Sequence, residues 1–446
     1  MSPERFGRLT DPPASIVLVG ARVIDPATGT DEIRDLAIHD GLVVDASHPA
    51  AERIDGSELI VAPGLCDLHA HLREPGDSGA ETTASGSRAA ARGGFTTIGV
   101  MPNTEPPIDS AEAVAAALAR AADAACEVRV IGAATRGREG REVAALEAMA
   151  AAGAVGFSDD GTAVPDALAA DVLGRLARLG LPLVEHAEDA SLAQGGVMRA
   201  GPTAHRLGLR GWPADAEVAV VERDLALARS IGGRVHFTHL SVPASVAAVV
   251  EARARGMQVT CDVTPHHLAM TDEWVAGSRR FAWEERVEVS AERAYDGACR
   301  VNPPLGSRQD ARALLALLAD GSIDAIATDH APHPSERKLV PFGRAAPGLI
   351  GLETALSLGL AAVEAGRLGL LELIAALSTR PAAIIGATRG LSAGTRADLV
   401  AFDPGARWRV DASALASASA NTPLLGMELP GVVRLTVAAG RVTYRA

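Results

Sequence analysis

The 446-residue sequence contains very little lysine and few aromatic side chains. Lys338 is its only lysine, although lysine and arginine together number 42. Aromatic residues make up 3% of the chain, and the net charge is −13. Nucleic-acid sites need positive charge, and sites for single strands also need aromatic surfaces on which bases stack. We therefore expect no nucleic-acid partner.

Cysteine is scarce, and no long apolar run is present. The four cysteines are widely scattered and form no CxxC pair, which argues against a disulfide framework or a cysteine zinc site and predicts buried, reduced thiols. The first twenty residues lack the basic segment and apolar run of a signal peptide. Arg, Asp and Glu interrupt the Ala-rich runs, so no membrane span is expected. The expected location is the cytoplasm.

Two kinds of pattern fill the chain. Residues 15–60 and 397–446 contain short β-rich runs separated by Gly, Asp and Pro. Between them, apolar strand patterns alternate with Ala-, Leu- and Arg-rich helical patterns. The strands are expected to end near His71, Pro102, Ala134, Asp159, His186, His239, Val263 and Asp329.

Eight such units predict an α/β fold, a (β/α)8 TIM-like barrel. We expect a small β-sandwich domain formed by the N- and C-terminal segments, with residues 1–60 and 391–446 flanking a barrel of residues 61–390. An open doubly wound sheet is the alternative, but no GxGxxG turn follows any strand. Residues 271–300 are charged, break the alternation and are expected to leave the barrel as an excursion between its last two strands.

Histidine and aspartate gather at the expected strand ends. In "DLHAHL", His69 and His71 are two residues apart and therefore face the same side of a strand. Neutral imidazoles are good ligands for divalent metals. Catalytic residues of such barrels come from the carboxyl ends of the strands, so the pattern predicts a metal centre there. Its further candidates are Asp159, Asp160, His186, His236, His239, Asp329, His330 and His333.

More than four nitrogen and oxygen ligands imply two ions around a bridging hydroxide. Many such barrels join the ions through a carboxylated lysine, but here the only lysine follows strand eight. An aspartate from strand four can bridge instead, and Asp159 is the predicted bridge. Asp160 is expected to anchor the following loop. Asp329, at the end of strand eight, is the predicted catalytic residue that moves a proton between nucleophile and leaving nitrogen.

Seven motifs resemble the dihydroorotases of the amidohydrolase superfamily, of the bacterial type with a bridging aspartate. They are "DLHAHLREPG", "MPNTEP", "FSDDG", "EHAED", "VTPHHL", "VNPPL" and "ATDHAPH", in the order of that family. The resemblance covers nearly the whole chain. It implies reversible, zinc-dependent cyclisation of N-carbamoyl-L-aspartate to L-dihydroorotate in pyrimidine biosynthesis.

The resemblance also implies roles for individual residues. His69 and His71 would hold one Zn2+ with Asp329 close by, His186 and His239 would hold the second, and Asp159 would bridge them. The implied substrate contacts are His71, Arg73, Asn103, Asn302, His333, Pro347 and Gly348. Arg73 suits the carboxylate of the substrate, because a guanidinium binds a carboxylate through two parallel hydrogen bonds.

The sequence departs from the family in three places. Gly306 follows "NPPL" where arginine is usual, the segment before "RVNPP" is longer, and "APGLIGLET" replaces the commoner "APFG" form. These changes affect the pocket loop and the alignment of Asn302 and Pro347.

Some histidines are predicted not to bind metal. Strand alternation turns His236 and His330 away from the site, and His266 and His267 follow a strand that carries no ligand in the family.

Two other functions are considered. One is a different cyclic amidase, such as a dihydropyrimidinase or an allantoinase, which generally uses the lysine bridge. The other is a non-catalytic dihydroorotase-like partner of aspartate transcarbamoylase, which would have lost metal ligands that this chain retains. A homo-oligomer acting on a small molecule is expected, and association with aspartate transcarbamoylase remains open.

Overall fold

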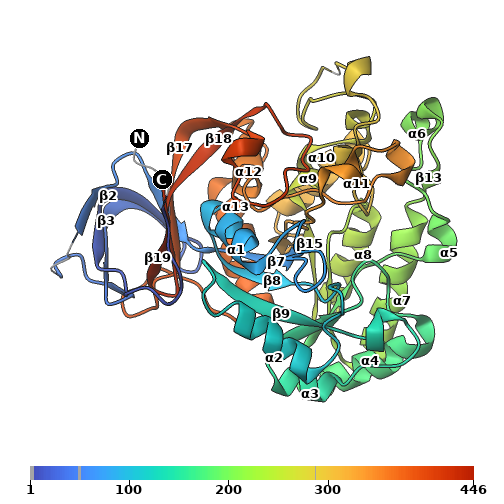
Figure 1. Cartoon of the computed structure of the whole chain (residues 1–446), viewed down its shortest axis with the longest axis horizontal. Helices are drawn as coiled ribbons and strands as arrows, with labels where there is room; N and C mark the ends of the chain where they lie inside the picture. Colours follow the sequence, from blue (N-terminus) through green and yellow to red (C-terminus); the bar gives the residue numbers. More distant parts are fainter. Residues whose placement is uncertain (1–4, 49–51, 287) are drawn as a thin grey trace.

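The computed structural model describes residues 5–48, 52–286 and 288–446. Its larger part is a barrel of eight parallel strands, as predicted (Figure 1). Each strand is short and buried along most of its length, as expected when helices cover the outside of a parallel sheet. In spatial order the strands are β7 (Leu65–Ala70), β8 (Phe95–Val100), β9 (Glu127–Ala133), β10 (Ala154–Ser158), β11 (Pro182–Glu185), β14 (Arg234–Phe237), β15 (Val259–Val263) and β16 (Ala325–Ile326).

The barrel closes where the residues after β16 meet β7. Thr328 donates two hydrogen bonds to the Asp67 carboxylate, from its backbone N at 2.7 Å and its Oγ1 at 2.6 Å. The backbone N of His71 donates to the carbonyl of His330 at 2.9 Å, and His330 N donates to the carbonyl of His69 at 3.3 Å. The ends of the first and eighth strands are therefore held side by side.

Amphipathic helices cover the barrel. In α10 (Arg308–Ala319), Ser307 and Asp310 form a capping box at the N-terminus, while Leu314, Leu315 and Leu318 are buried on one face. The other long helices are α1 (Thr83–Arg92), α2 (Ala111–Arg120), α4 (Asp166–Leu179), α7 (Asp215–Ile231), α8 (Pro243–Ala254) and α12 (Ala355–Glu364). Shorter ones are α3 (Leu146–Ala151), α5 (Ala190–Ala193), α6 (Pro202–Leu207), α9 (Pro265–Ala269), α11 (Ser335–Lys338), α13 (Leu370–Ile374) and α14 (Arg380–Ile384).

The two ends of the chain form a separate nine-stranded sheet with its own apolar core, centred on residues such as Leu18, Leu36 and Leu399. Figure 1 shows the N-terminal and C-terminal strands side by side, on one flank of the barrel. The chain passes from this sheet into the barrel at Gly64, between β6 and β7. The path is β1 (Arg5–Phe6), β19 (Arg441–Arg445), β18 (Glu428–Ala438), β17 (Leu399–Arg409), β6 (Ile60–Pro63), β2 (Ile16–Asp25), β3 (Thr30–His39) and β4 (Leu42–Val44), with β5 (Glu52–Asp55) beside β2.

The excursion between β15 and β16 is made of turns and short 3-10 segments that pack against the barrel. Trp274 is fully buried, and Phe281 stacks between it and Trp283, with ring centroids 6.0 and 4.9 Å away. All four cysteines are buried free thiols, as predicted. Among the described residues, no helix is long and apolar enough to cross a membrane.

Candidate metal centre

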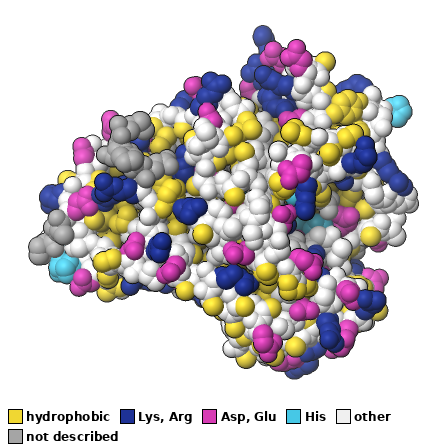
Figure 2. Space-filling model, in the orientation of Figure 1, with side chains coloured by type: hydrophobic (Ala, Val, Ile, Leu, Met, Phe, Trp, Pro, Cys, Tyr) yellow, Lys and Arg dark blue, Asp and Glu magenta, His cyan; other side chains and the backbone are white. Residues whose placement is uncertain are grey.

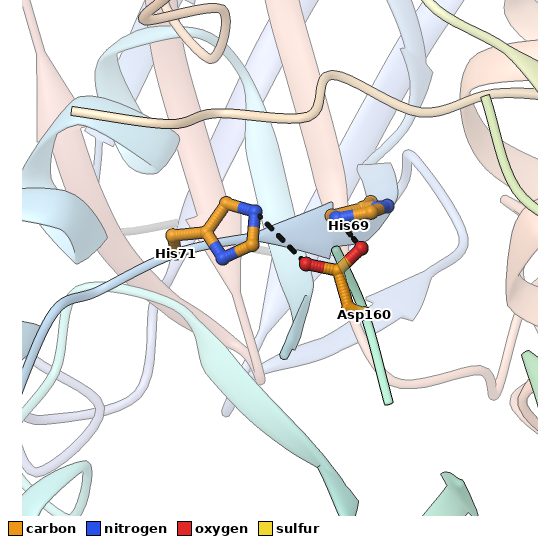
Figure 3. Close-up of side chains that lie close together, drawn as sticks. All are labelled: His69, His71 and Asp160. Carbon is orange, nitrogen blue, oxygen red and sulfur yellow. Dashed lines mark ion pairs between the residues drawn. The ribbon is translucent and has the colours of Figure 1, made fainter. Parts of the chain in front are cut away.

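Four histidines from three strands surround one carboxylate at the mouth of the barrel. The carboxylate belongs to Asp160, two residues beyond the end of β10 (Figure 3). Its Oδ1 lies 3.2 Å from His69 Nε2, 3.7 Å from His186 Nδ1 and 3.9 Å from His239 Nε2. Its Oδ2 lies 3.6 Å from His71 Nε2. The ligand atoms form two groups that could each hold a metal ion, and Asp160 belongs to both.

Asp159 is not at this centre, so the structure corrects the prediction that it supplies the shared carboxylate. Its Oδ1 accepts a hydrogen bond from Thr135 N at 2.9 Å, and its Oδ2 accepts one from Thr135 Oγ1 at 2.5 Å. The two aspartates have exchanged their predicted roles. Asp159 fastens the end of β10 to the end of β9, while the next residue points among the imidazoles.

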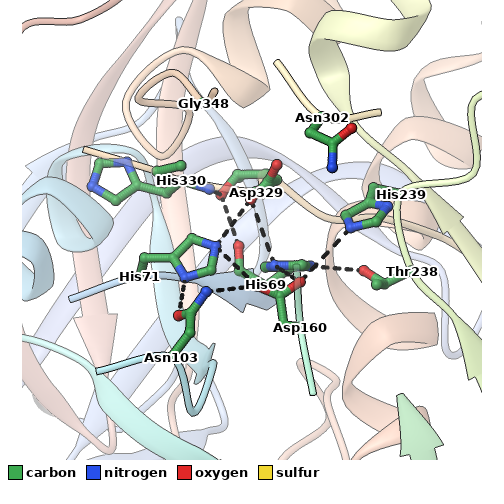
Figure 4. Close-up of polar contacts among 12 residues, drawn as sticks. His69, His71, Asn103, Asp160, Thr238, His239, Asn302, Asp329, His330 and Gly348 are labelled. Carbon is green, nitrogen blue, oxygen red and sulfur yellow. Dashed lines mark hydrogen bonds and ion pairs between the residues drawn. The ribbon is translucent and has the colours of Figure 1, made fainter. Parts of the chain in front are cut away.

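Asp329 lies beside the same group, at the end of the eighth strand. Its Oδ1 is 3.1 Å from His71 Nε2 and 3.5 Å from His69 Nε2 (Figure 4). Burial alone would raise the pKa of this carboxyl, but His69 and His71 outweigh it and hold the pKa below its usual range. Asp329 is therefore an ionised carboxylate that can accept a proton.

Neighbouring groups determine which nitrogen of His69 and His71 faces the centre. Thr238 donates its hydroxyl proton to Asp262 at 3.2 Å, so its oxygen is left to accept the Nδ1 proton of His69 at 2.8 Å. Asn103 donates its amide to Asp160 at 2.8 Å, so its Oδ1 accepts the Nδ1 proton of His71 at 2.7 Å. Both histidines therefore present an Nε2 lone pair to the centre.

A hydrogen-bond partner also orients His186, but here the partner binds Nε2 and the nitrogen that faces the centre is Nδ1. Glu188 Oε2 lies 3.4 Å from His186 Nε2, which leaves Nδ1 as the lone pair that faces His239 Nε2 at 2.9 Å. Hydrogen bonds from a ring nitrogen to a carboxylate or hydroxyl are the usual support of metal-binding histidines. Sequence reasoning missed Thr238 and Asp262, because their contacts depend on the register of β14 and β15.

This arrangement requires positive charge at its centre. The ring nitrogens of His69, His71 and His186 that carry lone pairs face the oxygens of Asp160, and His69 Nε2 is buried with no hydrogen-bond partner in the described part of the chain. Burial opposes charge on His69 and His186, yet the neighbouring carboxylates outweigh it and raise their pKa values to about 9 and about 10. A site that attracts protons this strongly, with nitrogen and oxygen donors on all sides, fits divalent cations.

Three residues at the same place have strained backbone conformations. Arg73, His239 and Asp329 adopt φ angles of 56°, 41° and 46°, in the left-handed region that residues other than glycine seldom occupy. Such conformations are retained where the position of a side chain matters more than local stability. The strain places three of the predicted site residues at the barrel mouth.

The predicted substrate contacts lie around the centre. Arg73 Nη2 is 3.5 Å from His333 Nε2, and His333 Nε2 is 2.8 Å from the carbonyl of Pro347. Asn302 Nδ2 donates to Glu188 Oε2 at 2.8 Å and lies 3.4 Å from His186 Nε2. Gly348 and Asn302 appear above the cluster in Figure 4. The predicted substrate contacts are therefore arranged around the imidazoles, with Asn103 on the side of Asp160 and Asn302 and Gly348 on the opposite side.

Three of the four histidines predicted not to bind metal have hydrogen-bond partners outside the cluster around Asp160. His236 Nε2 bonds Asp262 at 2.8 Å, and His330 Nε2 bonds Glu81 at 3.2 Å. His267 donates to the carbonyl of Pro303 at 2.9 Å. Gly306 directly precedes the capping box of α10, so the departure from the family motif falls at a helix start rather than among the ligands.

A cavity of about 900 Å³ lies beside the centre, between the excursion and residues 418–427. His333 lines it, but none of the imidazoles around Asp160 does. Figure 2 shows histidine side chains at the bottom of a hollow on the same face of the molecule as the view in Figure 1. The cluster of metal-ligand candidates is therefore separate from the lining of this neighbouring cavity.

Comparison with known proteins agrees with this geometry. The family model described as Dihydro-orotase-like matches residues 58–245. The chain is 43% identical over 437 residues to the dihydroorotase of Anaeromyxobacter dehalogenans strain 2CP-1, covering 96% of this chain and 98% of that one. It is 42% identical to the dihydroorotase of Geobacter sp. strain M21, covering 97% and 100%.

Solved structures agree on the architecture. L-hydantoinase (dihydropyrimidinase) from Arthrobacter aurescens superposes with a TM-score of 0.83 at 27% identity, covering 96% of each chain. A D-hydantoinase structure gives a TM-score of 0.79 at 23% identity, which supports the fold alone. With its barrel, its donor cluster and relatives of this similarity along its whole length, the chain belongs to the dihydroorotase family of metal-dependent cyclic amide hydrolases.

Proposed function

We propose that this protein catalyses the reversible closure of N-carbamoyl-L-aspartate to L-dihydroorotate with two zinc ions. The observation that carries the proposal is the Asp160 carboxylate shared by two groups of histidines. His69 and His71 would hold one ion, His186 and His239 the other, and Asp160 would bridge them. Identity of 43% to a dihydroorotase over nearly the whole chain supports the choice of substrate.

The side chains divide the chemistry among them. Divalent ions at this site supply Lewis acidity, which activates water and polarises an amide carbonyl. Asp329 moves the proton: in ring closure it takes a proton from the carbamoyl nitrogen as that nitrogen bonds the carboxylate carbon, and it gives this proton to the carboxylate oxygen that departs as hydroxide. In ring opening it takes the proton of the attacking hydroxide and gives it to the departing amide nitrogen.

The substrate contacts fix the ring beside Asp329. Arg73 and Asn103 would bind the free carboxylate of the substrate, and Asn302 and the backbone at Pro347 and Gly348 would bind the ring. His333 Nε2 donates its proton to the carbonyl of Pro347, so the other ring nitrogen, Nδ1, is an acceptor. This Nδ1 is buried and has no partner in the described part of the chain. It can accept a ring N–H of dihydroorotate.

A hydantoinase or dihydropyrimidinase activity is the second candidate, favoured by the likeness to the Arthrobacter aurescens enzyme. The aspartate after β10 argues against it, since the rival amidases generally carry a modified lysine as the bridge. The proposal includes a cytoplasmic location and a homo-oligomeric state. It also includes association with aspartate transcarbamoylase.

The test is a metal analysis combined with assays on three cyclic amides. We expect about two zinc ions per chain and turnover of dihydroorotate far above that of hydantoin or allantoin. Turnover of hydantoin or allantoin without dihydroorotate would refute the substrate assignment. A single bound ion in fully active protein would refute the binuclear centre.

A further inference from the structure

The single lysine of the chain is buried next to the proposed substrate contacts. Lys338 ends the short helix α11 in the loop after the eighth strand, and its side chain is only 5% exposed. Its Nζ donates to three backbone carbonyls: Arg300 at 3.2 Å, Ala346 at 2.7 Å and Gly348 at 2.8 Å. An ammonium group has three N–H donors and no acceptor, so its hydrogen-bonding capacity is filled by these three oxygens.

The three carbonyls come from the two segments that carry the proposed ring contacts. Arg300 precedes Asn302 by two residues, and Ala346 and Gly348 flank Pro347. The segments also meet directly, because Gly348 N donates to the carbonyl of Arg300 at 2.9 Å. Lys338 therefore joins both segments through their backbone carbonyls.

The backbone that Lys338 holds has little freedom. Gly348 has a φ of 125°, and a Cβ added there would lie 2.5 Å from the Cβ of Ala331. Asn421 Nδ2, from the segment between β17 and β18, also donates to the carbonyl of Gly348 at 3.2 Å. An arginine could not replace the lysine, because its planar fork cannot direct three donors at oxygens that converge on one point.

We propose that Lys338 is a positioning residue for the substrate, which holds Asn302 and the Pro347–Gly348 backbone in the conformation that binds the ring. This inference rests on the proposed function, since it assigns those residues to the substrate. Lys338 touches neither the metal cluster nor the reacting atoms. Its loss should therefore weaken substrate binding and leave metal binding unchanged.

The test compares Lys338→Met with Arg344→Met, which removes a cation from an exposed position of the same loop. Burial lowers the pKa of Lys338 to about 7, so the ring-closing assay is run at pH 6, where all three donors are present. We expect Lys338→Met to raise KM about tenfold, with kcat and metal content near those of the wild type. Arg344→Met should leave all three unchanged.

Two results would overturn the proposal: an unchanged KM in Lys338→Met, or loss of metal and kcat together, which would indicate a general structural role. If the wild-type protein does not turn over dihydroorotate, the proposed function fails separately. The same KM comparison with hydantoin then tests the lysine independently.

A second measurement needs no variant and covers the case in which Lys338→Met does not fold. Wild-type protein grown with [ε-13C]lysine contains one labelled side chain, so its NMR spectrum reports Lys338 alone. We expect its signal to shift when an equilibrated mixture of dihydroorotate and N-carbamoylaspartate is added. A signal that does not move at saturating substrate would contradict the proposal.

Discussion

At the scale of single residues, the adjacent carboxylates of Asp159 and Asp160 have different surroundings: Thr135 bonds the first, and four imidazoles surround the second. His69 and His71 could be paired because strand alternation gives them the same face. Asp159 and Asp160 both lie beyond the last residue of β10, where alternation no longer determines direction. The hydroxyl and backbone N of Thr135 hold Asp159, and nothing in the local sequence identifies that contact.

The two aspartates give a direct test of the assignment. Asp160→Asn should lose most of its bound metal and nearly all activity, because an amide supplies no negative charge between the four imidazoles. Asp159→Asn should keep its metal and lose about 1 kcal/mol of stability, the usual contribution of one hydrogen bond. Metal analysis and urea unfolding of both variants measure these effects. Metal loss in Asp159→Asn alone would restore the original prediction that Asp159 is the bridge.

At the scale of secondary structure elements, repeated strand and helix patterns predicted the barrel, but its closure depends on contacts that are distant in sequence. β16 has only two residues, and residues 328–330 meet β7 through side-chain and backbone hydrogen bonds. Strand alternation places Asp67 on the same face of its strand as His69 and His71, so the sequence offered Asp67 as a hydrogen-bond partner for the last strand of the barrel. The excursion at 271–300 has no such periodicity, so its packing through Trp274 could not be foreseen.

Thr328→Val tests how much this closure contributes. Valine keeps the shape of threonine but removes the hydroxyl that bonds the buried Asp67 carboxylate at 2.6 Å. We expect a loss of about 1–3 kcal/mol in the free energy of unfolding. A fall in kcat should accompany it, because Asp329 is the next residue.

Urea unfolding and steady-state kinetics measure the two effects. Thr388→Val, at an exposed position, is the matched control and should change neither quantity. Wild-type stability in Thr328→Val would mean that the backbone hydrogen bonds alone close the barrel.

At the scale of the whole molecule, the C-terminal part of the chain supports the mouth of the barrel from outside. The segment between β17 and β18 reaches back to it: Ala418 N donates to Glu81 at 3.0 Å, and Asn421 bonds His333 N at 3.0 Å. Sequence patterns identified the terminal strands but gave no sign of these contacts, which join residues more than 80 positions apart. Contacts between segments far apart in the sequence thus support the surroundings of the centre, and the stability of the buried ligand atoms depends on the charge placed among them.

Removal of metal should therefore weaken the entire fold and not only abolish activity. A ligand that binds the folded state alone stabilises it by about 4 kcal/mol at a concentration a thousand times its Kd. We expect chelated wild-type protein to unfold at lower urea concentration than the zinc-loaded protein, and readdition of zinc to restore the midpoint. Asp160→Asn should unfold at nearly the same midpoint with and without zinc, because its two ligand groups have lost the carboxylate that they share. If chelation leaves both the midpoint and the turnover of dihydroorotate unchanged, the four histidines do not form a metal centre. Protons alone would then balance the charge of the carboxylates among the imidazoles.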